Sequence, residues 1–396
     1  MHTYTLLDHT NPDWLAQLDE LYAALGPANL TLLPSYFVKT SFARLGGHVL
    51  KITSQSGICG MGLLFPRARV EKRLLYTLRL QPAPAETLDG LAVAAVAEAL
   101  LAPAQVQIYH PADPQQYAPS YQAIGEFDIG APTEAEAAVI PLLHQAIWQT
   151  APEARFPADI HSCGFGLGTS LVARHSGRVV GFLFGFISFG LPANISQLGI
   201  ESQTMGIDPA YRRYGLAALL KRRQAQQALE RGITLIHWTA DPLQFPNAGL
   251  NFGRLRAVAG AFYPNYYPFR NALNRVHPSR LGISWLLDSA HGRQGMIGGA
   301  GRRNLTDFPA VTLLNHGPEI LTSPIGSAAI AIEIPPDWTA LQSDDPLMAQ
   351  RWRDATDTIL SALIGMETGR YLVTDVATHG QHCYLIAQLY APELIG

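Results

Sequence analysis

Cysteine and charge are both scarce in this sequence of 396 residues. The three cysteines, Cys59, Cys163 and Cys383, are odd in number and far apart, which argues against a disulfide framework and a clustered metal site. We therefore expect buried free thiols and no metal. Charged residues make up 15% of the chain and leave a net charge of −3, without a long basic run. Nucleic acid is therefore not expected as a partner.

Long apolar stretches are missing as well. The longest apolar-rich run, residues 181–191, is too short to span a bilayer. The first eight residues lack a basic region followed by an apolar stretch, so no secretory signal is visible. Hydrophobic residues nevertheless make up 48% of the chain, and the length favours two or three domains. We expect a cytoplasmic globular protein without membrane insertion.

Two parts of the chain share one pattern of elements. Residues 49–65 and 170–186 each have the pattern of a β-hairpin that turns at Ser-Gly. A strand, a helix and a strand follow each hairpin, at 74–80, 86–101 and 106–109 in the first half and at 203–207, 216–231 and 234–239 in the second. This order predicts a tandem pair of domains with mixed α/β structure.

Glycine, proline and a helix-start signal mark the boundary between the two copies. Residues 125–132 carry Gly and Pro, and Thr133 followed by Glu136 matches a capping box. Near the C-terminal end the pattern predicts strands at 328–334, 371–376 and 383–389 and a helix at 346–364. We expect three domains, residues 1–128, 129–290 and 291–396.

One loop of the second copy has a pattern suited to bind a diphosphate. Arg212, Gly215 and Ala217 form the spacing Arg-x-x-Gly-x-Ala directly before the helix predicted at 216–231. The first turn of a helix has unpaired N–H groups and partial positive charge, and small side chains let phosphate oxygens approach the backbone. Arg212 and the adjacent Arg213 can contact such an anion.

Neither the basic residues later in this helix nor the first copy is expected to bind the anion. Lys221, Arg222 and Arg223 come later in the helix, where such a cluster usually forms a solvated face. In the first copy, residues 80–88 contain prolines, which remove amide donors that a phosphate needs. The first copy is therefore not expected to hold an anionic cofactor.

In the second copy, the hairpin, strand, loop, helix and strand are followed by an Asn-bearing helix predicted at 247–259. In this order of elements, roughly residues 130–290 resemble the GCN5-related N-acetyltransferase (GNAT) superfamily. The resemblance implies tandem GNAT-like domains, the first degenerate and the second with the acyl-CoA site, plus a C-terminal α/β extension. It implies acetyl-CoA or another acyl-CoA as co-substrate and no metal. The residues expected to bind it are Met205, Ile207, Arg212, Arg213, Tyr214, Gly215, Leu216, Ala217, Asn247 and Asn251.

In this resemblance the pantetheine arm lies along the strand that precedes the loop. Gly206 is a residue type that lets a strand bulge there, although close packing is an equal alternative. An amide freed by the bulge, such as that of Ile207, would polarise the thioester carbonyl.

Attack by an amine needs a base, because the reference pKa of an alkylammonium is about 10. Glu201 is the candidate, since it lies eleven residues before Arg212, as the base does in histone-modifying members of the family. An extended strand would place Glu201 on one face with Gln203 and Met205. An ordinary strand carboxylate is the alternative. His237 is the substitute base, or a hydrogen-bonded core residue.

The departing thiolate needs a proton, which a tyrosine after the fifth strand gives in many family members. Phe252 stands at that position here. Tyr263, Tyr266 and Tyr267 could supply a phenol instead, or they pack beside the neighbouring prolines. A thiolate is already a tolerable leaving group, so the phenol is not strictly required.

The sequence thus predicts an acyl-CoA-dependent N-acyltransferase. It would transfer acetyl by default, by direct attack, to an amine of a small molecule or peptide. Residues 181–189 could line a channel for a longer acyl chain or simply form a core strand. Because Phe252 replaces the usual tyrosine, a catalytically inactive CoA-binding sensor or interaction protein is the alternative.

Overall fold

In the computed structural model, hairpins, strands and helices follow one another much as the sequence predicts. The structure describes residues 2–26, 29, 31–71, 73–113, 115–149, 151–189, 198–267, 275–298, 301–321 and 326–394. The chain divides into two compact units, Met1–Gln224 and Ala225–Gly396. The division falls inside helix α5 (Leu216–Glu230). The expected division into three domains stays a prediction.

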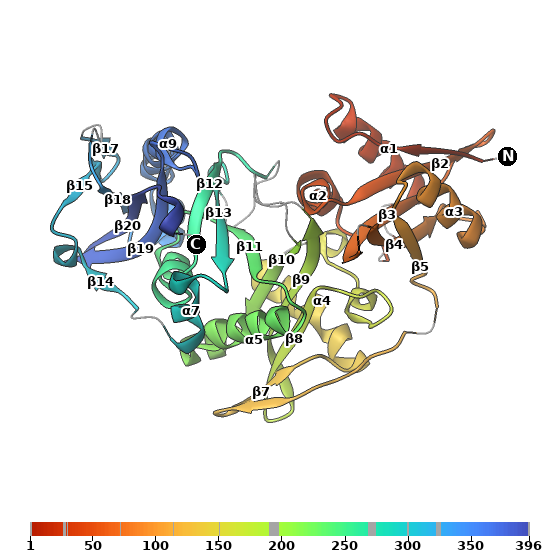
Figure 1. Cartoon of the computed structure of the whole chain (residues 1–396), viewed down its shortest axis with the longest axis horizontal. Coiled ribbons are helices and arrows are strands. Elements are labelled where there is room, and N and C mark those ends of the chain that lie inside the picture. The colour runs from red at the N-terminus through yellow and green to blue at the C-terminus, as the bar shows by residue number, and fades with distance from the viewer. Residues whose placement is uncertain are drawn as a thin grey trace. The chain divides into compact units, whose positions relative to one another are not determined.

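The first half of unit one is a five-stranded sheet in the order β1-β2-β3-β4-β5 (Figure 1). Its strands are β1 (Thr3–Leu6), β2 (His48–Ser54), β3 (Gly57–Val70), β4 (Arg73–Pro82) and β5 (Gln105–Tyr109), and its helices are α1 (Trp14–Leu25), α2 (Ser35–Phe37) and α3 (Gly90–Leu100). Only the last pair of strands, β4 and β5, is parallel, and α3 connects them. Val93, Ala94 and Ala97 of α3 pack in one buried cluster with β2, β3 and β4, which covers this face of the sheet.

The second half of unit one contributes antiparallel strands in the order β10-β9-β8-β7-β6. Their bounds are β6 (Gln122–Ile124), β7 (Phe127–Gly130), β8 (Thr169–His175), β9 (Arg178–Phe189) and β10 (Leu198–Ile207), and helix α4 spans Glu134–Trp148. The segment expected as the boundary between the two copies, 125–132, contains β7. Phe127 and Ile129 of this strand are buried on either side of exposed Asp128, the alternation of a strand.

The predicted start of α4 is confirmed. The Thr133 hydroxyl accepts a hydrogen bond from the amide of Glu136 (3.2 Å), and the Glu136 carboxylate accepts one from the amide of Thr133 (2.8 Å). The same carboxylate pairs with Arg174 of β8 (2.7 Å), so the helix start is tied to the sheet.

Phenylalanines from both halves form the centre of unit one. Phe186 of β9 stacks on Phe37 and Phe65, with ring centroids 5.0 and 5.4 Å apart, and Phe156 lies edge-on to Phe184 at 5.1 Å. Each such pair adds about 0.5–1.5 kcal/mol beyond the burial of apolar area. The apolar run at 181–189 is therefore a core strand, and its phenylalanines are used in packing.

Unit two contains strands in the order β15-β18-β20-β19-β12-β13-β11, with β14 beside β19 and a separate pair β16-β17 (Figure 1). The strands are β11 (Leu235–Ala240), β12 (Val258–Tyr263), β13 (Arg280–Leu286), β14 (Arg303–Asn304), β15 (Val311–Leu313), β16 (Asn315–His316), β17 (Glu319–Ile320), β18 (Ala329–Ile334), β19 (Tyr371–His379) and β20 (His382–Leu389). The helices are α6 (Phe245–Ala248), α7 (Ala290–Ile297), α8 (Trp338–Asp344) and α9 (Pro346–Leu363). The strands and the long helix predicted after residue 328 are thus all present.

A buried ion pair ties α9 to the sheet of unit two. Arg353, 1% exposed, donates a hydrogen bond to Asp241 (2.7 Å), which also lies 3.5 Å from Arg280. Burial alone would raise the pKa of Asp241, but the two guanidinium groups hold it below its usual value. Loss of one partner would leave a buried charge unpaired, which is costly.

The helix predicted at 247–259 is wrong in its second half. α6 continues into a π-helical turn, Gly249–Arg254, and Arg256 then adopts a positive φ of 54° that ends the helix. Residues from Val258 onward form β12, where Val258 pairs with Ser284 of β13. Strand pairing therefore outweighed the helical pattern of this segment.

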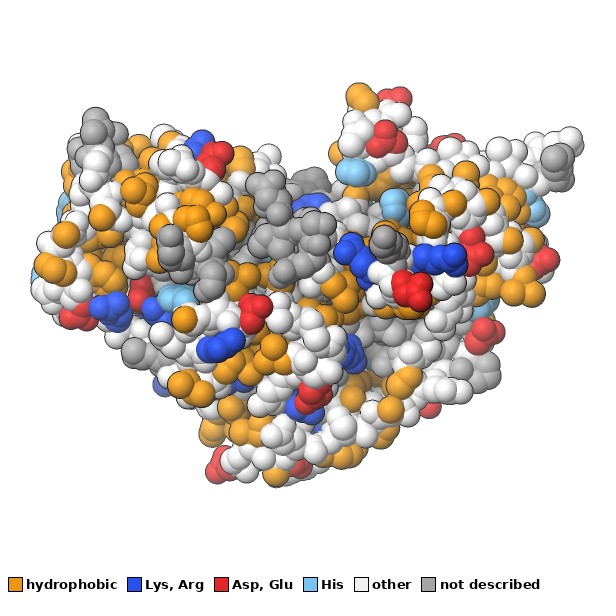
Figure 2. Space-filling view, viewed as in Figure 1, with side chains coloured by type: hydrophobic (Ala, Val, Ile, Leu, Met, Phe, Trp, Pro, Cys, Tyr) orange, Lys and Arg blue, Asp and Glu red, His pale blue; other side chains and the backbone are white. Residues whose placement is uncertain are grey.

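The surface and two of the three thiols are as the composition predicts. On the face drawn in Figure 2, basic and acidic side chains are interspersed among polar and hydrophobic ones. Cys59 and Cys383 are buried free thiols as expected, whereas Cys163 is exposed. No helix in the described part of the chain has both the length and the apolar character needed to cross a membrane.

Asp89 caps α3, so Asp89→Ala should weaken the start of this helix. The carboxylate accepts hydrogen bonds from the amides of Leu91 (3.0 Å) and Ala92 (3.2 Å). Loss of such a cap costs about 0.5–2 kcal/mol. We expect faster hydrogen exchange in α3, measured by mass spectrometry. Asp89→Asn keeps a capping oxygen and should leave exchange unchanged; equal exchange in both variants would contradict this role.

Candidate functional site

The predicted phosphate loop connects β10 to α5 through a short 3-10 helix, Pro209–Tyr214. The Asp208 carboxylate accepts a hydrogen bond from the amide of Ala210 (3.0 Å) and pairs with Arg178 (3.0 Å). At the other end Gly215 adopts φ 76° and ψ 9°, a left-handed conformation that costs little without a Cβ atom. The path of the loop is therefore fixed at both ends by local interactions.

The N-terminus of α5 is open. The amides of Ala218 and Leu219 donate to the carbonyl of Gly215 (3.0 and 3.3 Å), whereas those of Leu216 and Ala217 have no acceptor among the described residues. A Cβ atom placed on Gly215 would meet nothing within 4 Å beyond its chain neighbours. Two amides at this helix start thus lack an acceptor within the described part of the chain, as an anion site requires.

The corresponding helix of the first half is closed instead. The amides at the start of α3 already donate to the carboxylate of Asp89, which places negative charge where a phosphate would lie. Pro82 and Pro84 precede this cap. The prediction that the first copy cannot hold the cofactor thus gains a second physical reason, the carboxylate cap.

A pocket of about 650 Å³ is lined by the loop residues Pro209, Ala210, Arg212, Arg213 and Tyr214. Arg212 and Arg213 are exposed, and neither has an ion-pair partner among the residues described. Two exposed guanidinium groups without an ion-pair partner in the described structure, a few residues before the open amides, are well suited to a diphosphate.

The strand before the loop contains a β-bulge, but not at Gly206. In the pairing of β10 with β9, Glu201 lies opposite Phe186 and Thr204 opposite Phe184, so the extra residue falls between Glu201 and Thr204. A Cβ atom on Gly206 would lie 2.6 Å from the ring of Phe182. Gly206 therefore serves close packing, which was the alternative expectation.

The bulge also changes which residues share a face with Glu201. Because Phe186 and Phe184 are two residues apart, Glu201 and Thr204 lie on the same face of the sheet. Met205 lies opposite Leu183 and packs with Ile207 in the cluster under α5. The expected common face of Glu201 and Met205 is wrong, since the bulge reverses the alternation between them.

Lys221 corrects another expectation, because it is 3% exposed rather than part of a solvated face. Its ammonium group donates a hydrogen bond of 2.7 Å to the hydroxyl of Ser202, which lies in the bulge. Burial lowers the pKa of Lys221 to about 7, although the charge of Glu201 acts in the opposite direction. A buried amine that titrates near neutral pH thus contacts the bulge.

Sequence reasoning missed Lys221 and Ser202. A usable signal existed, since Lys221 lies one helical turn after Ala217 and one before buried Ala225, on the inward side of α5. The basic neighbours Arg222 and Arg223 hid this spacing; both are half-buried.

The other predicted site residues belong to unit two. His237 of β11 is 5% exposed, Asn251 is 4% exposed, and Asn247 is exposed. Phe252, at the usual tyrosine position, is 1% exposed.

The predicted phenols lie together on another part of unit two. Tyr263 ends β12, and its ring centroid lies 5.7 Å from that of Tyr266, which lies 4.8 Å from that of Tyr267. Arg280 covers the ring of Tyr267 at 4.9 Å. Packing therefore accounts for part of this aromatic group. The catalytic roles of Tyr263, Tyr266 and His237 stay predictions.

Comparison with protein families identifies the segment that contains the loop. Residues 140–250 match the model of the acetyltransferase (GNAT) family. These residues form a GNAT acetyltransferase domain. The matched region includes β8, β9, β10, the open loop, α5 and β11, in the order expected from the sequence.

Solved acetyltransferase structures are similar to about two fifths of the chain. The ribosomal-protein-S5-alanine acetyltransferase of Vibrio fischeri is 13% identical over 43% of this chain and 97% of its own, with a TM-score of 0.34. Naa50 of Arabidopsis thaliana, with the bisubstrate analogue CoA-Ac-MVNAL, is 12% identical over 40% and 97%, with a TM-score of 0.31. The ribosomal-protein-S18-alanine N-acetyltransferase of Escherichia coli is 13% identical over 40% and 92%, with a TM-score of 0.30. No curated protein sequence matches the chain.

The titration of Lys221 predicts a specific pH dependence. Its pKa is about 7 in the fold against 10.5 for a free lysine, so between these values the unfolded chain binds more protons and stability rises with pH. Lys221→Met removes this contribution. The melting temperature of the wild type minus that of Lys221→Met should therefore increase from pH 7 to pH 10 and stay constant below pH 6. Thermal denaturation across this range measures the difference, and a constant difference throughout would contradict the lowered pKa.

Proposed function

We propose that this protein is an acyl-CoA-dependent N-acyltransferase that transfers an acetyl group to an amine. The observation that carries the proposal is the open N-terminus of α5, where the amides of Leu216 and Ala217 have no acceptor among the described residues and follow directly on a loop that lines a pocket with two exposed arginines. Small residues, open amides and unpaired guanidinium groups are the requirements of a diphosphate site. The GNAT family match of residues 140–250 supports coenzyme A as the source of that diphosphate.

Backbone amides and side chains of the loop would each bind a different part of the cofactor. The amides of Leu216 and Ala217 would bind the pyrophosphate, while Arg212 and Arg213 would neutralise its charge. Tyr214 is 56% exposed at the pocket, with its ring 5.9 Å from that of Phe127, and offers an apolar surface to the rest of the nucleotide. Met205 and Ile207 support the loop from below by packing under α5.

The bulge in β10 supports a hydrogen-bond donor to the acyl group of the bound cofactor. A bulge leaves a residue outside the regular ladder, so its amide can bind a pantetheine group or the developing oxyanion. We place this donor at the bulge beside Ser202 rather than at Ile207. Lys221, which donates to the Ser202 hydroxyl, then acts as a positioning residue for the bulge.

In the transfer step the acceptor nitrogen attacks the thioester carbon, the C–S bond breaks and the acetyl group forms an amide. Glu201 adjoins the bulge and would take the proton from the acceptor ammonium. The thiolate leaves and takes a proton, from solvent or from a tyrosine. We propose acetyl rather than a longer chain because Phe182, Phe184 and Phe186, the apolar side chains that could line a channel, are packed in the core.

Charge reversal at the loop tests the cofactor site. In the double variant Arg212→Glu/Arg213→Glu, two anions replace the cations at the pocket, and both residues are exposed, so folding should persist. We expect acetyl-CoA to bind at least about tenfold more weakly, a loss of about 1.4 kcal/mol or more. Isothermal titration calorimetry with acetyl-CoA measures the change.

Arg293→Glu is the matched control, because Arg293 is an exposed arginine of α7 in unit two. Its affinity for acetyl-CoA should equal that of the wild type. Equal affinities in the double variant and the wild type would disprove the diphosphate site, as would no heat with the wild type at millimolar acetyl-CoA.

Glu201→Gln tests the base. The amide keeps the size of the side chain but cannot accept a proton, so kcat should fall by about 10²–10⁴ while acetyl-CoA affinity stays constant. Acetylation of a panel of amino compounds and peptides, followed by release of free CoA thiol, measures kcat. Glu153→Gln, at an exposed carboxylate of the same unit, is the control. An unchanged kcat in Glu201→Gln would exclude Glu201 as the base.

One observation favours a second candidate function, a CoA-binding sensor without catalysis. The position that is usually a tyrosine is Phe252, which is buried and offers no proton. Acetyl-CoA binding without acetylation of any amine in the panel would support the sensor. Turnover with any acceptor would exclude it.

A further inference from the structure

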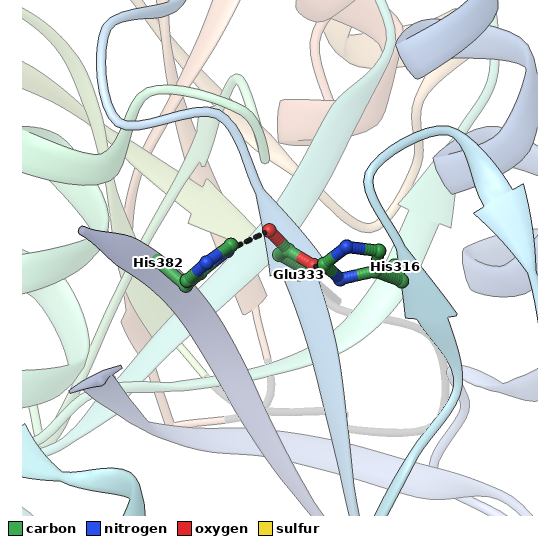
Figure 3. A group of neighbouring side chains, drawn as sticks. All are labelled: His316, Glu333 and His382. Carbon is green, nitrogen blue, oxygen red and sulfur yellow. Dashed lines mark hydrogen bonds and ion pairs between the residues drawn. The ribbon is translucent and has the colours of Figure 1, made fainter. Parts of the chain in front are cut away.

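Three side chains from separate strands of unit two converge at one place, outside the GNAT domain (Figure 3). Glu333 lies on β18, with His316 of β16 on one side and His382 of β20 on the other. The Glu333 carboxylate lies 2.7 Å from Nδ1 of His382 through Oε1 and 3.3 Å from Nδ1 of His316 through Oε2. One ligand atom from each residue lies within 4.8 Å of the other two.

The backbone around this cluster is fixed by its own hydrogen bonds. The side chain of Asn315, 0% exposed, donates to the carbonyl of Glu333 (2.9 Å) and accepts from its amide (2.8 Å). The amide of Gly317 donates to Oε2 of the Glu333 carboxylate (3.0 Å). These bonds hold His316, which lies between Asn315 and Gly317, at a set position beside β18. Such outer contacts orient the ligands of metal sites.

The separations among the three groups are compatible with a single metal ion. Ligand atoms about 2.0–2.2 Å from a tetrahedral ion lie roughly 3.3 Å from one another, which matches the 3.3 Å between Glu333 Oε2 and His316 Nδ1. The 2.7 Å between Glu333 Oε1 and His382 Nδ1 is a hydrogen bond that a bound ion would replace. Two imidazoles and one carboxylate are a ligand set of catalytic zinc sites. Imidazole nitrogen favours Zn²⁺, Co²⁺ or Ni²⁺ over Mg²⁺ and Ca²⁺, which prefer oxygen.

Burial differs within the cluster in the way a solvent-accessible metal site requires. The side chain of Glu333 is 6% exposed, whereas those of His316 and His382 are 68% and 46% exposed. The carboxylate thus forms the floor, and the imidazoles form the rim through which an ion can enter. Water can fill the remaining coordination positions.

We propose that His316, Glu333 and His382 bind one divalent transition-metal ion, with Zn²⁺ as the representative. The sequence predicts no metal, since its three cysteines are far apart. The three residues of this site are also far apart in sequence, and only the pairing of β18 with β20 and the Asn315 contacts bring them together.

Calorimetry on the full chain without a histidine tag, after removal of metals with a chelator, tests the proposal. Titration with Zn²⁺ should show one equivalent bound, and Co²⁺ should bind with the visible absorption of a site with low coordination number. His316→Gln and His382→Gln should each weaken binding at least about tenfold, since even loss of an outer contact costs 10–100-fold. The double variant should bind no Zn²⁺ at this site.

His9→Gln, which replaces an exposed histidine of unit one, is the control and should bind Zn²⁺ like the wild type. Circular dichroism and melting temperature without metal verify that the variants fold. No binding by the wild type at millimolar Zn²⁺ would overturn the proposal. Equal Zn²⁺ affinity in the double variant and the wild type, or equal losses in the control and the site variants, would overturn it as well.

Discussion

The left-handed turn at Gly215 is the constraint on which the candidate site depends. The chain leaves β10 at Ile207 and must reverse into α5 within a few residues. Asp208 and the 3-10 helix start this reversal, and the positive φ of Gly215 completes it. Because no described residue caps them, the amides of Leu216 and Ala217 at the start of α5 stay available. The same geometry that connects β10 to α5 therefore also leaves open the amides of the proposed anion site.

Unit one contains two helix starts that follow the same order of hairpin and strand but differ in electrostatics. At α3 the carboxylate of Asp89 occupies the amides, whereas at α5 a glycine and two arginines leave them open to an anion. The tandem origin of these halves stays a prediction. The contrast nevertheless shows how few residues determine whether the amides of a helix start are capped within the fold or left open.

Local patterns predicted much of the fold and little of the interior of the site. Hairpins, α4 with its capping box and the loop at Arg212 follow from spacing and turn residues, which act over a few positions. The bulge after Glu201 was not predictable, because it depends on pairing with β9. The burial of Lys221 depends likewise on how α5 packs against β10.

The site in unit two shows the same limit more strongly. His316, Glu333 and His382 lack any common motif, since three different strands supply them. Their convergence depends on strand register and on the buried amide of Asn315. The end of the helix before β12 was likewise decided by strand pairing rather than by helical pattern.

The aromatic stack at the centre of unit one has a consequence for dissecting this protein. Phe37 and Phe65 come from the first half, while Phe156, Phe184 and Phe186 come from the second. A cut near residue 128 would leave both fragments with bare ring faces and a tendency to aggregate. The segment that matches the GNAT family thus shares its core with the sheet that precedes it, and a fragment designed from unit one should keep both halves.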